Sequence, residues 1–558
     1  MVGGKNDFSR LLGGLFIGSD VTSHLRRLLP LRATESPADV AIARGVAAGW
    51  VHVLVASIVG PVQTYFLLRY LDKSDAGYWL VVFSFTNYLA LFDLGIGPTL
   101  TRRIAFIQGT ADASGRGTQV KHPRFAVLNT QVADLIATVR RLYLCLAAVL
   151  VTTALAAGPL ILPHVAKRPF TSSVAYAWTL VVLGSATNLV GTVSYSALAG
   201  LGVVGVNRFV RATAQLTGLV LSIAALRAGY GVPGIATSWL VQNVLFFLAG
   251  GYLLHQFCPE LHGLLGIART TMAREMIGPS LRWAGISVGA AMIFAIGPAI
   301  ISYDLGPELV PQYVVLYQLF NALYAVSLIP TQASEPFVAR AYGAGEHGGV
   351  LALLTRNLRH VAIPLVCGSA FLGTFGQEVV TLWVGPGNFA GNLSLWLFVA
   401  LFVLETHHVV HASVVMATGH IIFLPAAIGA GLLTVGLSLV LVPQLGVVGM
   451  VLSMFLAQVV TNNWYAPWYS LRLLGVPLKS YLAALAPLGW FALGTAAAAI
   501  ACKTTLLALG VAEPRVVAGA GLFATLLVGM SLAWKLALKP AERDLVVVKV
   551  RHLRRLSG

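Results

Sequence analysis

The sequence predicts an all-α polytopic membrane protein, because apolar residues dominate its composition and recur in stretches long enough to cross a bilayer. Of the 558 residues, 57% are hydrophobic and only 10% are charged, and the mean hydropathy is +0.81. Soluble domains carry about 25% charged residues. A helix that crosses about 30 Å of hydrocarbon needs about 20 mostly apolar residues. Such stretches repeat from residue 45 to residue 538, so most of the chain is expected to lie in lipid.

Short polar, glycine or proline breaks divide these stretches into about 14 predicted membrane-spanning helices. Their expected ranges are 45–68, 77–99, 140–163, 173–201, 208–229, 231–256, 277–303, 311–332, 358–378, 391–418, 421–442, 446–470, 481–501 and 516–538. Residues 1–44 form an arm before the first helix, whose short apolar run favours an interfacial segment over a cleaved signal peptide. A basic tail, 539–558, follows the last helix.

The distribution of Lys and Arg predicts that both termini are cytoplasmic. With the N-terminus inside, 30 of the 37 Lys and Arg residues fall on the cytoplasmic side, as the positive-inside rule requires. The formal net charge of +17 then reflects topology and attraction to an anionic leaflet, rather than a nucleic-acid partner. In the cytoplasmic loop 107–139, apolar residues recur at helical spacing beside arginines, which predicts an amphipathic segment on the inner leaflet.

Three absences exclude other classes of protein. The four cysteines show no ligand spacing, so neither a metal nor another cofactor is expected. No G-x-x-x-x-G-K-[S/T] motif appears, and no loop is large enough to house a nucleotide-binding domain, which disfavours a primary pump. The outside loops are short and hold no cluster of catalytic acids, which disfavours a membrane glycosyl polymerase or ligase. A transporter without enzymatic activity is the expected class.

Two matches within the sequence indicate that helices 1–6 and helices 7–12 are repeats. In the second and eighth helices, two aromatic residues and an asparagine follow one another at spacing four, starting at Trp79 and at Tyr313. The sixth and twelfth helices both open on Gly-x-x-Gly, at Gly231 and Gly446, with Ser and Gln following. Transporters often place the substrate between such repeats. The predicted parts are an N-lobe 45–256, a linker 257–276, a C-lobe 277–471 and two added helices 481–538.

The first hairpin carries a motif typical of one transporter family. The stretch Leu67-Leu-Arg-Tyr-Leu-Asp-Lys-Ser-Asp-Ala-Gly77, followed by Asp93-Leu-Gly-Ile-Gly97 and then Arg102-Arg103, resembles polysaccharide transporters. The resemblance is to the O-antigen (Wzx-type) flippase branch of the multidrug/oligosaccharidyl-lipid/polysaccharide (MOP) exporter superfamily. It covers residues 45–110 specifically. The chain departs from that family's pattern in its long N-terminal arm and in a cytoplasmic insertion around 109–124.

The resemblance implies a fold and a function. The fold would be two MATE-like six-helix lobes around a V-shaped central cavity, with two further helices. The function would be flipping of an undecaprenyl-pyrophosphate-linked oligosaccharide from the inner to the outer leaflet of the bacterial inner membrane, by alternating access. The lipid-linked oligosaccharide and membrane lipids would be its partners, with polymerase and chain-length machinery as an option. A cation-coupled multidrug exporter of the same superfamily is the main alternative.

Ionisable residues within membrane helices are costly, which makes them candidate functional residues. Cations are needed for a pyrophosphate, and the candidates are Arg282, Arg208, Arg211 and, on the exit side, Arg69. For these arginines the alternative is an ordinary positive-inside flank. Asp93, Arg102 and Arg103 could form a gate built on an Asp–Arg pair, or a pair that only fixes the helix end.

Two further groups of residues complete the predicted site. An aromatic and amide stripe could line the cavity and contact sugars, or could be ordinary helix packing; its members are Trp79, Phe83, Asn87, Tyr313, Tyr317, Asn321 and Tyr324. A buried Glu or His can change charge as access alternates, and the candidates for ion coupling are Glu405, His408, His411 and Glu335. The His-x-x-x-His spacing within 407–411 lacks further ligands for zinc, so a structural cluster or a coupling site is favoured.

Overall fold

The computed structural model describes residues 37–113, 130–257, 267–420, 422–540 and 542–544. Every regular element within these ranges is helical. Fourteen helices or pairs of consecutive helices are long and apolar enough to cross a membrane. Each coincides with one of the 14 predicted ranges, so the predicted fold class is confirmed. The arm 1–36, the linker residues 258–266 and the tail from 545 lie outside the described residues.

The N-lobe contains the first six spans. Their bounds are α3 (Pro37–Tyr70), α4 (Lys73–Leu89) with the short η1 (Ala90–Asp93) and α5 (Ile96–Ala113), α6 (Thr130–Val165), α7 (Ser172–Gly200), α8 (Val204–Arg227) and α9 (Gly231–Phe257). The second span is broken between η1 and α5, where Leu94 and Gly95 have positive φ angles of 50° and 71°. Within the lobe, α3 packs along α8 and α7 packs along α9.

The C-lobe and the C-terminal hairpin contain the other eight spans. Their bounds are α11 (Thr270–Phe294) with α12 (Gly297–Leu305), η2 (Pro307–Leu309) with α13 (Val310–Ser327) and α14 (Ile329–Gly343), α15 (His347–Val384), η3 (Pro386–Asn388), α16 (Asn392–Ala417), α17 (Leu424–Leu445), α18 (Val447–Leu473), α19 (Leu478–Ala508) and α20 (Pro514–Leu532) with the π-helical η4 (Ala533–Ala537). In this lobe α16 and α17 both pack on α18.

The internal repeat is visible in the local geometry of the sixth and twelfth spans. Gly231 and Gly446 open α9 and α18 with positive φ angles of 55° and 62°, which glycine adopts without steric cost. Seven residues later, Ser238 and Ser453 each donate a side-chain hydrogen bond to the carbonyl oxygen four residues before. The two Gly-x-x-Gly openings therefore occupy equivalent places in the two lobes.

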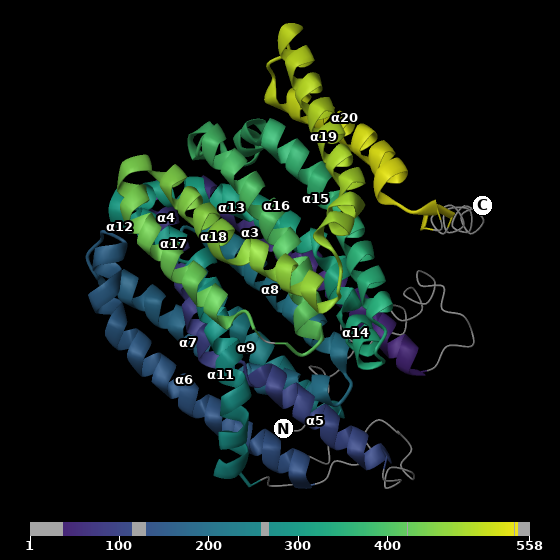
Figure 1. The fold of residues 1–558 in the computed structure, drawn as a ribbon. Coiled ribbons are helices and arrows are strands. Elements are labelled where there is room, and N and C mark those ends of the chain that lie inside the picture. Colours follow the sequence, from purple (N-terminus) through teal and green to yellow (C-terminus); the bar gives the residue numbers. More distant parts are fainter. Residues whose placement is uncertain (1–36, 114–129, 258–266, 421, 541, 545–558) are drawn as a thin grey trace, which may run out of the picture.

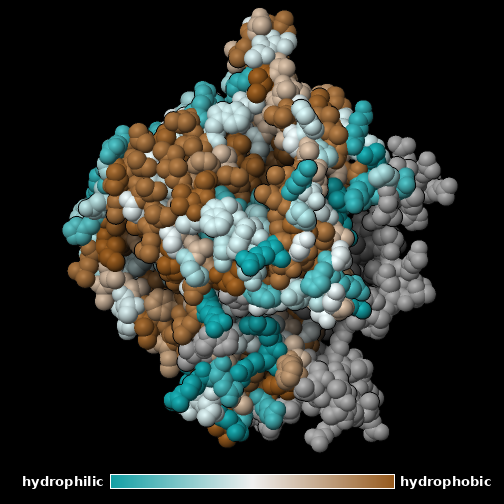
Figure 2. Space-filling model, in the orientation of Figure 1, coloured by the Kyte–Doolittle hydropathy of each residue, from teal (hydrophilic) through white to brown (hydrophobic). Residues whose placement is uncertain are grey.

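The surface is apolar, as expected for a protein in lipid. Figure 2 shows hydrophobic side chains covering much of the visible bundle, while hydrophilic side chains gather toward the lower end, where α11 begins. We call this end, which holds the end of α5 and the starts of α8 and α11, the basic end. The charge bias predicts that it is cytoplasmic. The opposite end holds the loops that follow α3, α6, α12 and α15.

One predicted segment differs from expectation. Residues 130–139 of the predicted amphipathic loop are the first turns of α6, and Val132, Leu135 and Val139 are fully or almost fully buried. These apolar residues pack inside the protein, so the helical spacing here reports a buried face rather than a face on the membrane surface. Residues 114–129 of that loop lie outside the described residues.

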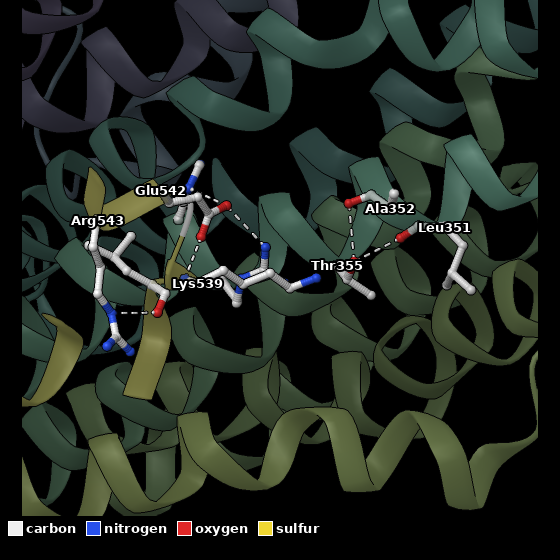
Figure 3. Close-up of polar contacts among 9 residues, drawn as sticks. Leu351, Ala352, Thr355, Lys539, Glu542 and Arg543 are labelled. Atoms are coloured by element: carbon white, nitrogen blue, oxygen red, sulfur yellow. Dashed lines mark hydrogen bonds and ion pairs between the residues drawn. The ribbon is translucent and has the colours of Figure 1, made fainter. Parts of the chain in front are cut away.

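The α19–α20 hairpin lies outside both lobes and is fastened to α15. Figure 1 shows it in yellow, extending beyond the rest of the bundle. Toward the opposite end, Lys503 Nζ lies 2.8 Å from a carboxylate oxygen of Glu378 on α15. At the basic end, Glu542 accepts hydrogen bonds from Arg359 on α15 and from the Lys539 backbone N–H, at 3.1 and 2.7 Å (Figure 3).

The residues around the Glu542 carboxyl group determine its charge. Burial raises the pKa of the Glu542 carboxyl, but the Lys539 N–H and the Arg359 guanidinium outweigh that effect and hold the pKa below its usual range. Glu542 is therefore ionised at neutral pH and acts as a charged link between the start of the tail and α15.

The two lobes meet closely at the opposite end. Lys73 Nζ and Gln312 Nε2 donate to the Gly387 carbonyl oxygen at 3.2 and 3.4 Å. A Cβ atom on Gly77 would lie only 1.7 Å from the Pro307 carbonyl oxygen on η2. This end is therefore closed in the structure, and the absence of a side chain at residue 77 is a condition for that closure.

Substituting Gly77→Ala is expected to hold the opposite end open, because the added methyl group would overlap the backbone at Pro307. Double electron–electron resonance would measure the distance between spin labels attached at Lys73→Cys and Pro386→Cys, in a background without the native cysteines. This distance should be longer with Gly77→Ala than in the same labelled protein with Gly77. Gly436→Ala is the matched control, since a Cβ there has no neighbouring atom within 4 Å. An unchanged distance distribution for Gly77→Ala would contradict this account of closure.

Candidate functional site

At the basic end, the start of α11 contacts two helices of the N-lobe: Arg269 pairs with Asp134 of α6 at 2.8 Å, and a second contact joins α11 to α5. Arg103 pairs with Glu275 at 2.9 Å, and the hydroxyl oxygens of Thr99 and Ser280 lie 3.1 Å apart. The side chains of Arg103 and Glu275 are 35% and 63% exposed, so the pair contributes at most about 1 kcal/mol. A contact this weak can open and close without a large energy barrier.

The structure revises the predicted Asp–Arg gate. Asp93 accepts a short hydrogen bond from the hydroxyl of Tyr143 on α6, and the backbone N–H groups of Gly95 and Gly97 also donate to it. Asp93 thus caps the start of α5 within the N-lobe, and neither arginine is its partner among the described residues. Arg102 is exposed. Of the three gate candidates, Arg103 crosses between the lobes, and it does so through Glu275.

A cavity of about 200 Å³ lies inside the N-lobe, among α3, α4, α8 and α9, with Gln318 of α13 reaching it from the C-lobe. Trp79, Phe83 and Trp239 form aromatic walls. The centroid of the Phe83 ring lies 5.2 Å from that of Trp239, in an edge-to-face arrangement, and 5.9 Å from that of Trp79, with the two rings tilted. The cavity is therefore a preformed, aromatic-walled space, located in one lobe rather than centrally between the two.

Amide side chains supply most of the polar surface of this cavity. Gln63, Gln215, Gln242 and Gln318 all line it, and none of its lining residues is charged. The side-chain oxygens of Gln215 and Gln318 are buried and accept no hydrogen bond from any described residue. Leaving such a group unpaired costs about 1–3 kcal/mol. The cavity therefore offers unsatisfied neutral acceptors to a ligand.

Two arginines lie on the same face of α8 as the cavity-lining residues, nearer the basic end. Arg211 follows Arg208 by three residues and precedes Gln215 by four, so the three lie on one helix face, and Ser222 continues that face. The Arg211 guanidinium lies 4.2 Å from the centroid of the Phe246 ring, which holds it by a cation–π contact. One helix face thus presents two cations and then an amide, leading into the cavity.

The surroundings of these arginines include a residue of the other lobe. Arg208 is close enough to Glu335 on α14 for their charges to interact. The positive charges of both arginines also act on His52 of α3, where they disfavour a protonated ring; its Nδ1 atom is buried and has no hydrogen-bond partner among the described residues. Arg208 and Glu335 are both exposed and form no ion pair with each other within 4 Å, so the attraction between them is weak and long-range.

The remaining arginine candidates lie elsewhere. Arg69 is exposed at the end of α3 farthest from Arg208, on the opposite end of the bundle. Arg282 is exposed on α11 in the C-lobe. The structure does not group either of them with Arg208 and Arg211.

The aromatic and amide stripe divides between the lobes. Trp79 and Phe83 line the N-lobe cavity, which is not the central cavity for which they were proposed, and Asn87 and Asn321 are exposed. Three members pack inside the C-lobe against Phe398 and Phe402 of α16 instead, and these are Tyr313, Tyr317 and Tyr324. For the tyrosines, the structure shows the helix packing that was one of the two predicted alternatives.

A polar cluster occupies the interior of the C-lobe. Gln458 Nε2 donates to a Glu405 carboxylate oxygen at 2.6 Å, and Asn462 Nδ2 donates to Gln458 Oε1 at 2.6 Å. His408 Nδ1 lies 2.8 Å from the Asn462 carbonyl oxygen. Glu405 is only 5% exposed and has no cationic partner among the described residues. Its carboxyl group is therefore bonded to a neutral amide rather than to a charge.

The second histidine face of α16 contacts the added hairpin. The Tyr481 hydroxyl on α19 lies 2.6 Å from His407 Nε2 and 2.7 Å from His411 Nε2, and His411 Nδ1 lies 2.5 Å from the Ser470 hydroxyl. No group of three or more His, Cys, Asp or Glu residues in the described part of the chain is arranged to hold a metal ion. The cluster is a hydrogen-bonded network joining three helices.

Sequence reasoning missed the amides of the cavity. Gln215 and Gln318 stand alone in apolar helices and match no motif, and Trp239 reads as an ordinary apolar residue. A signal was available for Gln215, because it continues the face of Arg208 and Arg211 at helical spacing. No such signal pointed to Gln318, which reaches the cavity from the other lobe.

Comparison with solved structures shows the fold. The chain is similar to the lipid II flippase MurJ in an inward closed conformation, with a TM-score of 0.64 and 11% identity, covering 89% of this chain and 99% of that one. The chain is also similar to an inward-facing MATE family multidrug transporter of the MOP superfamily, with a TM-score of 0.60 and 14% identity, covering 75% of this chain and 95% of that one. For an outward-facing MATE transporter of the same superfamily the TM-score is 0.56 and the identity 16%, covering 79% of this chain and 97% of that one.

No protein-family model matches the sequence, and no curated protein matches it. At these identities the comparisons establish the MATE- and MurJ-like fold. All three solved structures are of transporters or flippases by description.

Substituting Tyr481→Phe is expected to lower stability by about 1–3 kcal/mol, because two buried histidine nitrogens lose their shared partner. Thermal unfolding of the purified protein in detergent should show a lower midpoint. Tyr230→Phe is the control, since Tyr230 is 69% exposed. Equal midpoints for the two variants would show that the Tyr481 hydroxyl does not fasten α19 to α16.

Proposed function

We propose that this protein is a flippase that moves an undecaprenyl-pyrophosphate-linked oligosaccharide from the inner to the outer leaflet of the bacterial inner membrane, by alternating access. In this proposal the basic end and both termini are cytoplasmic. The observation that carries it is the face of α8, where Arg208 and Arg211 lead to Gln215 and the aromatic cavity. The order of cations followed by neutral amides matches the order of pyrophosphate and sugar in such a substrate.

The chemistry of each part fits its proposed role. Arginine binds phosphate oxygens through charge-assisted hydrogen bonds, and Arg211 is oriented by the Phe246 ring. Arg208 is exposed and forms no ion pair in the described structure, so its guanidinium is available to a pyrophosphate.

The extent of the structural match adds support. The lipid II flippase covers 89% of this chain, whereas the two MATE transporters cover 75% and 79%. The resemblance of the first hairpin to polysaccharide flippases rests on different residues and points the same way.

A cation-coupled multidrug exporter is the second candidate function. The observation that favours it is Glu405, a buried carboxyl inside the C-lobe without a cationic partner in the described structure. The N-lobe cavity argues against it, because a site for cationic drugs would need a carboxylate and none lines this cavity. In the flippase proposal, Glu405 serves ion coupling, with His408, His411 and Glu335 as neighbouring candidates.

Substituting Arg211→Ala is expected to slow flipping of a pyrophosphate-linked oligosaccharide by about 10- to 100-fold, since a hydrogen bond to a charged group contributes about 1.5–3 kcal/mol. Proteoliposomes with fluorescent lipid-linked substrate and a membrane-impermeant quencher would measure the rate. Arg227→Ala is the control, because Arg227 also lies over an aromatic ring, Phe66, but at the other end of α8. Wild-type protein that does not flip this substrate would contradict the proposed function.

Substituting Glu405→Gln is expected to flatten the pH dependence of flipping, because the amide cannot gain or lose a proton while the hydrogen bond with Gln458 can be retained. Flipping rates in proteoliposomes across a series of imposed pH gradients would test this. A pH profile identical to wild type would remove Glu405 from the coupling mechanism.

A further inference from the structure

The N-lobe cavity has the size of a single sugar ring. Its volume is about 200 Å³, below the range of about 300–1,000 Å³ that is typical for drug-sized ligands. A whole oligosaccharide cannot enter it. One monosaccharide unit of a longer chain can, with the rest of the chain outside.

The walls of the cavity combine two surfaces that a sugar ring needs. Trp79, Phe83 and Trp239 give apolar faces against which the C–H groups of a pyranose can pack. Gln63, Gln215, Gln242 and Gln318 give neutral donors and acceptors for its hydroxyl groups. A ligand hydroxyl that donates to Gln215 or Gln318 would satisfy a buried oxygen that has no partner in the described structure.

Gly218 leaves space for one of these amides. A Cβ on Gly218 would lie 2.1 Å from the Gln242 side-chain oxygen. Any other residue at 218 would displace the Gln242 amide. The close approach of α8 to α9 is therefore arranged around the Gln242 side chain.

The cavity selects against charge. None of its lining residues is ionisable, and moving an unpaired ionised carboxylate or ammonium group from water into such a site is strongly unfavourable. A uronic acid or an amino sugar with a free ammonium group would meet no compensating charge there. The nearest described cations on this path, Arg208 and Arg211, lie outside the cavity.

The spacing along α8 identifies which sugar unit would enter. From Arg211 to Gln215 the helix rises by about 6 Å, at about 1.5 Å per residue. A pyrophosphate held at Arg211 would therefore place the directly attached sugar beside Gln215. The next units of the chain would be too far from the arginines to occupy the same position.

Resting on the function proposed above, we infer that this cavity binds the sugar directly attached to the pyrophosphate, and that it accepts only an uncharged sugar there. Gln215 hydrogen-bonds to that sugar from the N-lobe, and Gln318 hydrogen-bonds to it from the C-lobe. The complete set of contacts therefore exists only while the two lobes are arranged as in this structure.

Saturation-transfer NMR with soluble sugars tests this inference without depending on flipping. Methyl glucoside and N-acetylglucosamine should receive saturation from the purified protein, and glucuronate should not. Gln215→Leu and Gln318→Leu should each reduce the apparent affinity for the neutral sugars by about three- to tenfold, the factor that one neutral hydrogen bond is worth. Gln256→Leu, which changes an exposed glutamine on α9 that bonds only to Tyr252, should have no effect.

The outcomes separate this inference from the proposed function. Equal binding of glucuronate and methyl glucoside, or equal effects of Gln215→Leu and Gln256→Leu, would overturn the inference even where wild-type protein flips the lipid-linked substrate. Selective binding of neutral sugars that is weakened in both Gln215→Leu and Gln318→Leu, and unchanged in Gln256→Leu, would support it. Two variants in different lobes guard against misfolding, because each should keep the thermal unfolding midpoint of the wild type.

Discussion

Hydrocarbon offers no hydrogen-bond partners, so each polar group inside this bundle must be satisfied by the protein or by what the protein carries. The backbone meets that requirement by forming helices throughout the described residues. Most side chains meet it locally, as Ser238 and Ser453 do by bonding to their own helices. The buried oxygens of Gln215 and Gln318 do not. Other buried side-chain atoms in the described structure also have no partner, but these two amides share one aromatic-walled cavity that has room for a ligand, which is why we place a polar ligand there.

Related helices have different roles in the two lobes. Gln242 on α9 and Gln458 on α18 follow the same Gly-x-x-Gly opening, yet Gln242 lines an open cavity and Gln458 is bonded to Glu405. In the C-lobe the corresponding space is filled by tyrosines and phenylalanines around that carboxyl. The structure thus supports a division of labour in our proposal, with substrate recognition in the N-lobe and ion coupling in the C-lobe.

Sequence alone predicted the fold well because its strongest signal, the length and apolarity of each span, is local. All 14 spans were placed this way. The repeat was also predictable, because both helices begin with the same Gly-x-x-Gly pattern in the sequence. In the structure, Gly231 and Gly446 both have positive φ angles. Partners across the fold were not predictable. Asp93 was expected beside an arginine and is bonded to Tyr143. Tyr313 was a candidate for cavity lining or for helix packing, and the sequence could not show that it packs on Phe398. Periodicity gives the face of a residue but not the neighbour that it meets.

A structure of the protein with a bound undecaprenyl-pyrophosphate disaccharide would test the central claim most directly. Our account predicts the pyrophosphate within hydrogen-bonding distance of Arg208 and Arg211, and the attached sugar between Trp79 and Gln215. A substrate bound instead beside Glu405 in the C-lobe, or with its sugars outside the N-lobe cavity, would contradict the account.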